Sequence, residues 1–424
     1  MKLVIKNIAR VESADIEIQG ITVVAGDNAT GKSTVSKSLY AILEMSNNAI
    51  SRAEMQKKRS FRTCIMSWKR RYVPIANMSD RIFCEEVERY YDKAEGNLSC
   101  FLDAMIGYVK ENMPDRFWDI TKMKHMIVRL FYDCSEIAGR DLGYYSQYIS
   151  NTILADVFQR QINCLKNNAE GSIYYIREDA KTKVKILNHK IAHMNRIYDA
   201  GSAQPVYITT PDLMDSMETF RKLYSAERFR TISYANSQLS KLLMEEQDPK
   251  RFVAEEYNKI EEQKQQLQKL FGEVLEGEIR LDERRLVYYD KWCEGNIELS
   301  NIASGMKIFL ILQNLVANGT FLEHTCLMID EPETNLHPEW QLKLAHLLVL
   351  LNKNLDIQIY VNSHSPYFVR AIEYYANQYQ MLEQCNFYIM RKDVVTGMCK
   401  SENVSDNLGV IYDRMAEPFN LIMG

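Results

Sequence analysis

Residues 21–40 read ITVVAGDNATGKSTVSKSLY, and this stretch decides the fold. Its first five residues are apolar or β-branched, which predicts a buried strand. The next nine residues, 26–34, fit the spacing G-x-x-x-x-G-K-[ST] of a phosphate-binding loop. Apolar residues at helical spacing follow, so the loop stands between a strand and a helix. That is the context in which such a loop binds phosphate, and a chance glycine turn would lack it.

The residue types in this loop suit the phosphates of a nucleotide. Gly26 and Gly31 allow the tight turn that brings backbone N–H groups toward a phosphate. The helix that follows presents its N-terminus, where free N–H groups and the helix dipole favour an anion. Lys32 places a cation on the β- and γ-phosphates, and Ser33 offers a hydroxyl to Mg²⁺. The residues assigned to phosphate binding are Gly26, Asp27, Asn28, Ala29, Thr30, Gly31, Lys32, Ser33 and Thr34.

The composition is that of a soluble globular protein. The chain has 424 residues, which is enough for two or three domains. Apolar residues make up 46% of it and charged residues 25%. The net charge of −4 gives no global electrostatic case for binding nucleic acid.

The cysteines and the hydropathy indicate a cytoplasmic location. Nine cysteines are scattered without a C-x-x-C pair, which argues for reduced thiols rather than disulfides or a zinc site. The first ten residues, MKLVIKNIAR, are too charged for a signal peptide. The sequence has no apolar stretch of about 18 residues, so we expect no membrane span and no membrane partner.

The periodicity of apolar residues divides the chain into segments. Residues 2–25 predict short strands, residues 172–188 a β-hairpin and residues 205–210 another strand. Two long glycine-poor stretches have helical spacing instead. We therefore expect a head built from residues 1–45, 165–212 and 277–395, helical insertions at residues 46–164 and 213–276, and a C-terminal tail at residues 396–424.

A basic run lies within the first helical stretch, at residues 57–71, with Phe61 and Trp68 among its seven Lys and Arg and Tyr72 directly after it. One interpretation is a patch for nucleic acid or an acidic partner. The other is a solvated helix face whose aromatics pack inward, which a single run without a motif favours.

His189 and His193 are four residues apart and can share a helix face. A metal site would need at least a third ligand, and no carboxylate pattern accompanies the two histidines. We therefore expect an ordinary helix surface there rather than a metal site.

Two carboxylates follow a second buried strand. Residues 325–331 read TCLMIDE, an apolar strand that ends in Asp330 and Glu331. Asp330 is placed to hold Mg²⁺ or its water. Glu331 is placed to orient and deprotonate an attacking water. A strand end with two solvated acids is the alternative, which the upstream phosphate loop disfavours.

A histidine follows a third buried strand. Residues 357–361 read IQIYV, and His364 comes shortly after them. A residue at the end of a parallel strand lies on the edge where such sheets bind ligands. His364 can there hydrogen-bond a γ-phosphate or the attacking water.

Three motifs together resemble the ABC-type ATPase heads of the SMC, RecF and overcoming-lysogenisation-defect (OLD) group. They are SNIASGMK at residues 300–307, DEPETNLHP at residues 330–338 and NSHSP at residues 362–366. The chain most closely resembles the AAA_21-like ATPases of prokaryotic defence operons. This resemblance implies an α/β fold: a P-loop NTPase head of the ABC type with a mixed sheet, a β-hairpin lobe and two helical insertions.

The resemblance also implies roles for individual residues. It assigns Ser33 and Asp330 to Mg²⁺, Glu331 to catalysis with Lys32 on the phosphates, and His364 to the switch histidine. Ser304 and Gly305 match a signature loop that contacts the γ-phosphate of the opposite subunit, although Met306 replaces its usual second glycine. Asn7 and Arg10 match positions near the base and the phosphates. A glutamine usual after the middle strand is absent from residues 209–212, and Gln159 lies upstream.

The implied function is an ATP-driven switch. Two heads would sandwich two ATP molecules with Mg²⁺, and hydrolysis would release the homodimer. The family resemblance implies a role in anti-phage defence, with a separately encoded effector as partner. The alternative is a RecF- or SMC-like ATPase that acts on DNA, for which residues 57–71 are the candidate surface. A nuclease-ATPase is disfavoured because only about 30 residues follow the last predicted strand, too few for a Toprim domain. A transporter ATPase subunit is disfavoured by the sequence of residues 330–338.

Overall fold

The computed structural model describes most of the chain. Its described residues are 1–72, 79–112, 119–166, 169–178, 180–195, 203–216, 233–244, 265, 267, 269, 271–272, 275–282, 285–321 and 325–423. The chain divides into two compact units, one formed by residues 1–47 and 151–424 and the other by residues 48–150. Much of the predicted second helical insertion, residues 213–276, lies outside the described residues.

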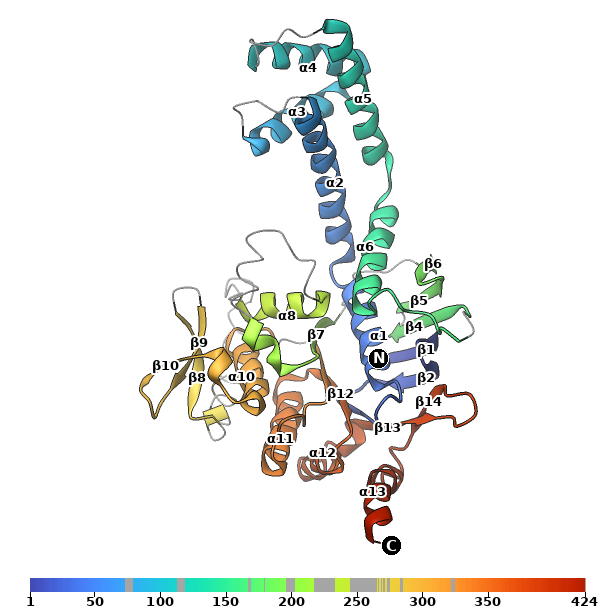
Figure 1. The fold of residues 1–424 in the computed structure, drawn as a ribbon, viewed down its shortest axis with the longest axis vertical. Helices are drawn as coiled ribbons and strands as arrows, with labels where there is room; N and C mark the ends of the chain where they lie inside the picture. The colour runs from blue at the N-terminus through green and yellow to red at the C-terminus, as the bar shows by residue number, and fades with distance from the viewer. Residues whose placement is uncertain are drawn as a thin grey trace. The chain divides into compact units, whose positions relative to one another are not determined.

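The first unit is built on a mixed sheet of eleven described strands (Figure 1). Their order across the sheet is β6-β5-β4-β1-β2-β14-β13-β3-β12-β11-β7. The strands are β1 (Lys2–Ile8), β2 (Val11–Glu17), β3 (Ile21–Ala25), β4 (Gly171–Arg177), β5 (Ala180–Leu187), β6 (Lys190–Met194), β7 (Gln204–Ile208), β11 (Thr325–Asp330), β12 (Gln358–Ser363), β13 (Cys385–Lys392) and β14 (Cys399–Asn403). This is the predicted α/β fold with a mixed sheet, and the prediction is confirmed.

The parallel half of the sheet, from β13 to β7, is covered on both faces. All five residues of β3 are buried, as a continuous apolar run in a parallel sheet predicts. The helix α1 (Lys32–Ser46) contacts β7, β11 and β12. Residues of α10 (Ser304–Ala317), α11 (Pro338–Leu355) and α12 (Pro366–Gln378) share one hydrophobic core with Val23, Ile329 and Val361. The strand ends are therefore fixed from both sides.

The antiparallel half carries the hairpin lobe. Strands β4 and β5 pair from Gly171↔Ile186 to Arg177↔Ala180, which confirms the predicted hairpin. The expectation of a helix face at His189 and His193 is wrong, because His189 lies in a turn and His193 in β6. Nδ1 of His189 accepts the backbone N–H groups of Ile162 and Asn163, each at 3.1 Å. His189 therefore holds the segment after α6 in place, because it supplies an acceptor for these two backbone N–H groups.

The sheet continues beyond the predicted head boundary at residue 395. Strand β14 lies between β2 and β13, parallel to the first and antiparallel to the second. Helix α13 (Gly409–Met423) follows it and packs on α12, with Ile411 fully buried. Residues 396–424 therefore complete the head rather than form a tail.

Smaller elements complete this unit. A separate antiparallel sheet has the order β10-β9-β8, with β8 (Gly277–Asp282), β9 (Arg285–Asp290) and β10 (Gly295–Glu298). The remaining elements are α8 (Tyr234–Met244) and the 3₁₀ turns η1 (Pro211–Ser216), η4 (Leu299–Asn301) and η5 (Leu382–Gln384).

The second unit is helical, as predicted for that stretch. It contains α2 (Ala49–Tyr72), α3 (Asp80–Ala94), α4 (Leu98–Asn112) and α5 (Ile120–Gly139), while α6 (Leu142–Val157) spans the boundary between the units. Its core is rich in aromatic residues, including Phe83 and Phe101 at 0% exposure.

The basic run of residues 57–71 lies on α2, and part of it is committed to the fold of this unit. Lys57 donates to the backbone oxygens of Ala138 and Arg140. Arg62 forms an ion pair with Glu88, and Lys69 is buried beside Asp80 at 2.8 Å. The aromatic residue Trp68 is also buried, so the inward-packing interpretation holds for these residues.

Candidate functional site

The phosphate loop has the backbone that its glycines predict. Gly26 and Gly31 adopt φ values of 148° and 90°, in the region that favours glycine. A Cβ at Gly26 would lie 2.9 Å from the carbonyl oxygen of Met390, and one at Gly31 would lie 2.7 Å from Val11. Both glycines are therefore required by space as well as by conformation.

The side chain of Lys32 lies inside the loop. Its Nζ donates to the carbonyl oxygens of Gly26 at 2.7 Å and Asp27 at 2.9 Å. Burial lowers the pKa of Lys32, while the carboxylates of Glu331 and Glu333 act in the opposite direction. An ammonium group has three N–H donors, so one remains available for a phosphate oxygen.

A pocket of about 400 Å³ opens above the loop. The residues lining it are Ala9, Arg10, Ala29, Thr30, Gly31, Lys32, Ser33, Thr34 and Glu331. The structure thus brings Arg10 and Glu331, which are far apart in sequence, to the phosphate loop. The lining brings two cations, Arg10 and Lys32, together at the start of α1, which suits a polyphosphate.

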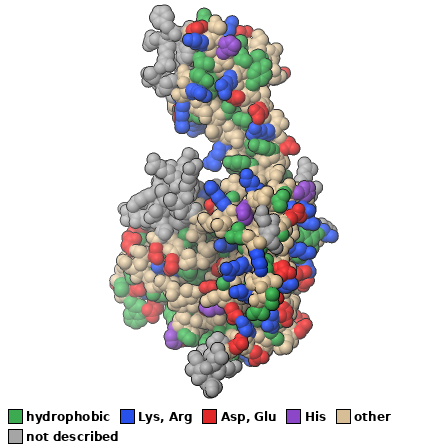
Figure 2. All heavy atoms as spheres, turned by 45° about the vertical axis from the view of Figure 1, so that its right-hand side comes forward, with side chains coloured by type: hydrophobic (Ala, Val, Ile, Leu, Met, Phe, Trp, Pro, Cys, Tyr) green, Lys and Arg blue, Asp and Glu red, His purple; other side chains and the backbone are tan. Residues whose placement is uncertain are grey.

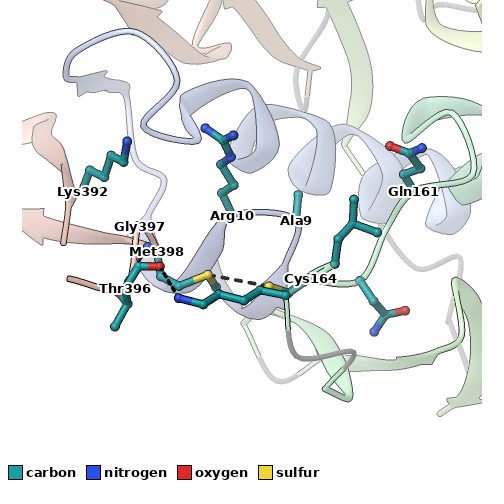
Figure 3. A pocket seen from close by; sticks show the side chains of 11 residues that line it. Ala9, Arg10, Gln161, Cys164, Lys392, Thr396, Gly397 and Met398 are labelled. Atoms are coloured by element: carbon teal, nitrogen blue, oxygen red, sulfur yellow. Dashed lines mark hydrogen bonds between the residues drawn. The ribbon is translucent and has the colours of Figure 1, made fainter. Parts of the chain in front are cut away.

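A second pocket, of about 510 Å³, adjoins the first and shares Ala9 and Arg10 with it (Figure 3). Figure 3 shows side chains that reach it from three segments: the β1–β2 turn, the chain after α6 and the β13–β14 connection. Its lining combines apolar groups such as Met398 with the amide of Gln161 and the cation of Lys392. Asn7 lines neither pocket; its side chain donates to the backbone oxygen of Glu170 at 3.2 Å.

Asp330 is held by hydrogen-bond donors from three other elements. Its Oδ1 accepts from Ser36 of α1 at 2.8 Å and from Asn362 of β12 at 2.6 Å. Its Oδ2 accepts from the hydroxyl of Tyr207 of β7 at 2.8 Å. The carboxylate is therefore fixed at the sheet edge, beside the helix that begins at the phosphate loop.

Glu331 and His364 lie next to each other at the same edge. Glu331 has φ 48°, and its backbone N–H donates to the oxygen of Asn362 at 2.9 Å, which turns its side chain into the phosphate pocket. Nδ1 of His364 lies 3.8 Å from Oε1 of Glu331 and 3.4 Å from Oε1 of Glu333. His364 is about 42% exposed and can turn toward a ligand.

Glu333 supports this histidine from beneath. It is 5% exposed, and its Oε1 accepts the Ser363 hydroxyl at 2.8 Å, the His364 N–H at 2.7 Å and the Ser365 N–H at 3.1 Å. The loop after β12 is thereby fixed through one carboxylate oxygen.

Ser304 and Gly305 lie at the start of α10, away from the pocket above the phosphate loop of the same chain. A Cβ at Gly305 would lie 2.6 Å from the backbone oxygen of Asn335. The glycine therefore allows α10 to approach the loop that follows Glu331 closely.

Five residues at the site were not identified from the sequence. Ser36, Tyr207 and Asn362 surround Asp330, Glu333 supports His364, and Arg414 of α13 donates to Oδ2 of Asp27 at 2.6 Å and 3.0 Å. Asn362 and Glu333 stand inside the quoted motifs, and Ser36 lies one helical turn after Ser33. For Tyr207 and Arg414 the sequence carries no local signal.

Comparison with known proteins assigns a family. The family model AAA_15, described as an AAA ATPase domain, matches residues 1–369. No curated protein sequence matches the chain. None of the helices in the described ranges is long and apolar enough to cross a bilayer.

Solved structures that match the chain include two SMC heads and one transporter ATPase. An SMC head bound to the C-winged helix domain of ScpA is 10% identical, with a TM-score of 0.45 over 96% of this chain and 98% of that chain. An SMC head with an extended coiled coil, bound to the C-terminal domain of ScpA derived from Pyrococcus furiosus, is 12% identical, with a TM-score of 0.41 over 97% and 98%. The ADP conformation of an ATP-binding cassette of an ABC transporter is 10% identical, with a TM-score of 0.36 over 100% and 99%.

Replacing Glu333 by alanine is expected to destabilise the first unit by several kcal/mol. Three donors would lose this acceptor, two of them in buried contacts, and each unsatisfied buried group costs about 1–3 kcal/mol. Urea unfolding measures the change. The control is Glu339→Ala, which removes only an exposed carboxylate paired with Lys343 and should change stability by less than about 0.5 kcal/mol. Equal stability of the two variants would contradict the support assigned to Glu333.

Proposed function

Because the chain belongs to the AAA_15 family of AAA ATPase domains, we propose that it binds ATP and hydrolyses it to ADP and phosphate. The observation that carries the proposal is the pocket in which Glu331 faces Lys32 and Ser33. A carboxylate beside a phosphate-binding loop can take a proton from a water that attacks the γ-phosphate. His364, next to Glu331, is placed to hydrogen-bond that water or the γ-phosphate.

The residues present fit a magnesium nucleotide. Mg²⁺ prefers oxygen ligands, and the hydroxyl of Ser33 and the carboxylate of Asp330 supply them near the phosphates. The metal would neutralise charge on the β- and γ-phosphates. Lys32 and the loop N–H groups bind the phosphates, and Arg10 stands where the phosphate pocket meets the second pocket. That second pocket, with its apolar and amide groups, is our candidate for the nucleoside.

The first test separates binding from hydrolysis. Glu331→Gln should bind ATP normally but lower its turnover by about 10²- to 10⁴-fold, since it removes the general base and keeps the side-chain shape. Lys32→Ala should instead weaken nucleotide binding itself. Fluorescent-nucleotide titration and phosphate release distinguish the two effects. Turnover by Glu331→Gln at the wild-type rate would refute the catalytic assignment.

We propose further that two chains form the working site. Ser304 and Gly305 match a loop that binds phosphate across a dimer, and they lie outside the phosphate pocket of their own chain. Ser304 stands at the N-terminus of α10, where free N–H groups favour an anion. ATP held between two heads would then join them, and hydrolysis would release them.

Ser304→Arg tests this dimer. The bulky cation should leave ATP binding by a single chain intact but block hydrolysis that depends on association. Turnover measured against protein concentration, with light scattering for mass, gives both quantities. Ser300→Arg is the matched control, since Ser300 is exposed on the adjoining η4 turn. Normal turnover by Ser304→Arg would exclude the sandwich.

We propose that the switch acts in the cytoplasm on a separately encoded effector in anti-phage defence. The support is the resemblance of the motifs to ATPases of defence operons. The Glu331→Gln variant, held in its ATP-bound state, is the bait for this partner, and the protein recovered with it from native cells identifies the effector. Phage challenge of cells carrying wild type or this variant tests the defence role.

The second candidate function is an ATPase that acts on DNA, and a specific surface favours it. Lys181, Lys183 and Lys185 alternate along β5 with buried residues, so all three point from the same outer face of the sheet. Lys183 stands opposite Tyr174 of β4, and one strand further Lys6 of β1 extends the same face. Figure 2 turns the flank that carries these strands forward and shows blue side chains on it.

This face differs from the basic run on α2 in how its charges are used. Lys185 pairs with Glu170 at 3.0 Å, whereas within the described residues Lys181 and Lys183 form no ion pair. Exposed ammonium groups beside a tyrosine suit phosphates and a stacked base.

Replacing Lys181, Lys183 and Lys185 by alanine should weaken DNA binding. The slope of log K against log salt concentration should fall in magnitude by about one for each phosphate that these lysines no longer neutralise. Fluorescence anisotropy at several salt concentrations measures this. The control is Lys58→Ala with Arg59→Ala and Arg70→Ala, three exposed positions of the α2 run with the same change in charge. If neither set changes binding, or if the wild type binds no DNA, the second function fails.

A further inference from the structure

Three buried side chains decide how much of Asp330 remains open to a metal. We propose that Tyr207, Ser36 and Asn362 are positioning residues: Ser36 and Asn362 fill the hydrogen-bonding capacity of Oδ1, while Tyr207 takes one position on Oδ2 and leaves the other for Mg²⁺ or its water. This inference rests on the proposed function, in which Asp330 serves the metal. Through Tyr207, strand β7 also contributes to the site, although the sequence predicts no site residue in this strand.

The two carboxylate oxygens of Asp330 accept different numbers of hydrogen bonds. A carboxylate oxygen has about two lone-pair positions. Oδ1 already accepts two hydrogen bonds, from Ser36 and Asn362 at 2.8 Å and 2.6 Å. Oδ2 accepts one, from Tyr207 at 2.8 Å. One position on Oδ2 therefore stays free among these contacts.

Both hydroxyls have their shortest contact with the carboxylate, at 2.8 Å, and the other acceptor of Ser36, the backbone oxygen of Ser33, lies further away at 3.2 Å. Ser36 and Tyr207 lie 3.0 Å apart, and each has a single proton to donate. Asn362 also donates to Ser36 at 3.1 Å, which closes a ring of contacts around the carboxylate.

The three side chains around Asp330 are held in place because they are buried and because other side chains support them. Ser36 and Asn362 are 0% exposed and Tyr207 is 2% exposed. The hydroxyl of Tyr360 donates to Oδ1 of Asn362 at 3.0 Å, which orients its amide nitrogen toward Asp330. The ring of Tyr207 packs against Tyr40, with 5.3 Å between centroids. Such support fixes a ligand in one rotamer before the metal arrives.

Tyr207→Phe is the decisive variant, since it removes one hydroxyl and keeps the ring. The probes are Mn²⁺, followed by its paramagnetic resonance signal, and a non-hydrolysable ATP analogue. We expect Mn²⁺ affinity in the presence of the analogue to fall about 10-fold, as for other residues that support metal ligands. Binding of the analogue in EDTA should not change. Unchanged or tighter Mn²⁺ binding would overturn the inference.

Two further variants separate this outcome from other failures. Tyr388→Phe is the matched control, because Tyr388 is also 2% exposed in the same sheet. Its hydroxyl, however, accepts a hydrogen bond from the backbone N–H of Glu17 at 2.9 Å. A loss of Mn²⁺ affinity in this variant would show that any buried hydroxyl matters, and it would overturn the specific role of Tyr207. Asp330→Asn tests the premise, since normal Mn²⁺ binding by this variant would refute the metal assignment itself. If Tyr207→Phe does not fold, Ser36→Ala takes its place, with the same expected loss and the same contrary result.

Discussion

The parallel pairing of β3 with β12 and of β12 with β11 is the constraint on which the site depends. The register places Ala25 beside Ser363 and Asp330 beside Asn362, so three strands end at one edge of the sheet. Chain segments more than 300 residues apart thus deliver the phosphate loop and the acidic and histidine side chains to the same place. Helices on both faces hold this edge, because the strands are buried on each side.

Neighbouring carboxylates at this edge have different tasks because their burial differs. Glu331 is about 41% exposed, with a positive φ that aims it into the phosphate pocket. Glu333, two residues later, has a side chain only 3% exposed and accepts three hydrogen bonds with one oxygen. Asp330 is half-buried, and its carboxylate accepts hydrogen bonds from Ser36, Tyr207 and Asn362. The exposed acid is suited to chemistry, and the buried acid to holding the loop that carries His364.

Much of this site could be predicted from the sequence because its signals are local. The phosphate loop shows its glycines and lysine within nine residues, and Asp330 ends a strand that is apolar without interruption. Tyr207 could not be predicted, since its hydroxyl meets Asp330 only through the pairing of β7 with β11. The five residues of β14 give too short a pattern to recognise, and its place between β2 and β13 depends on strands far away in the chain. For His189 and His193, a spacing of four residues predicts a shared helix face, but a turn followed by a bulged strand has the same spacing.

The strand order also dictates when the site can form during synthesis. The phosphate loop is made long before β12 and β13, yet β3 lies between these two strands, and β14 separates β2 from β13. A ribosome must therefore release β13 (Cys385–Lys392) before β3 has both neighbours, and until then the edges of β3 are unpaired. Pairing across such separations is slow. We expect nascent chains of this protein to acquire nucleotide binding late and all at once, and to need protection from aggregation until that moment.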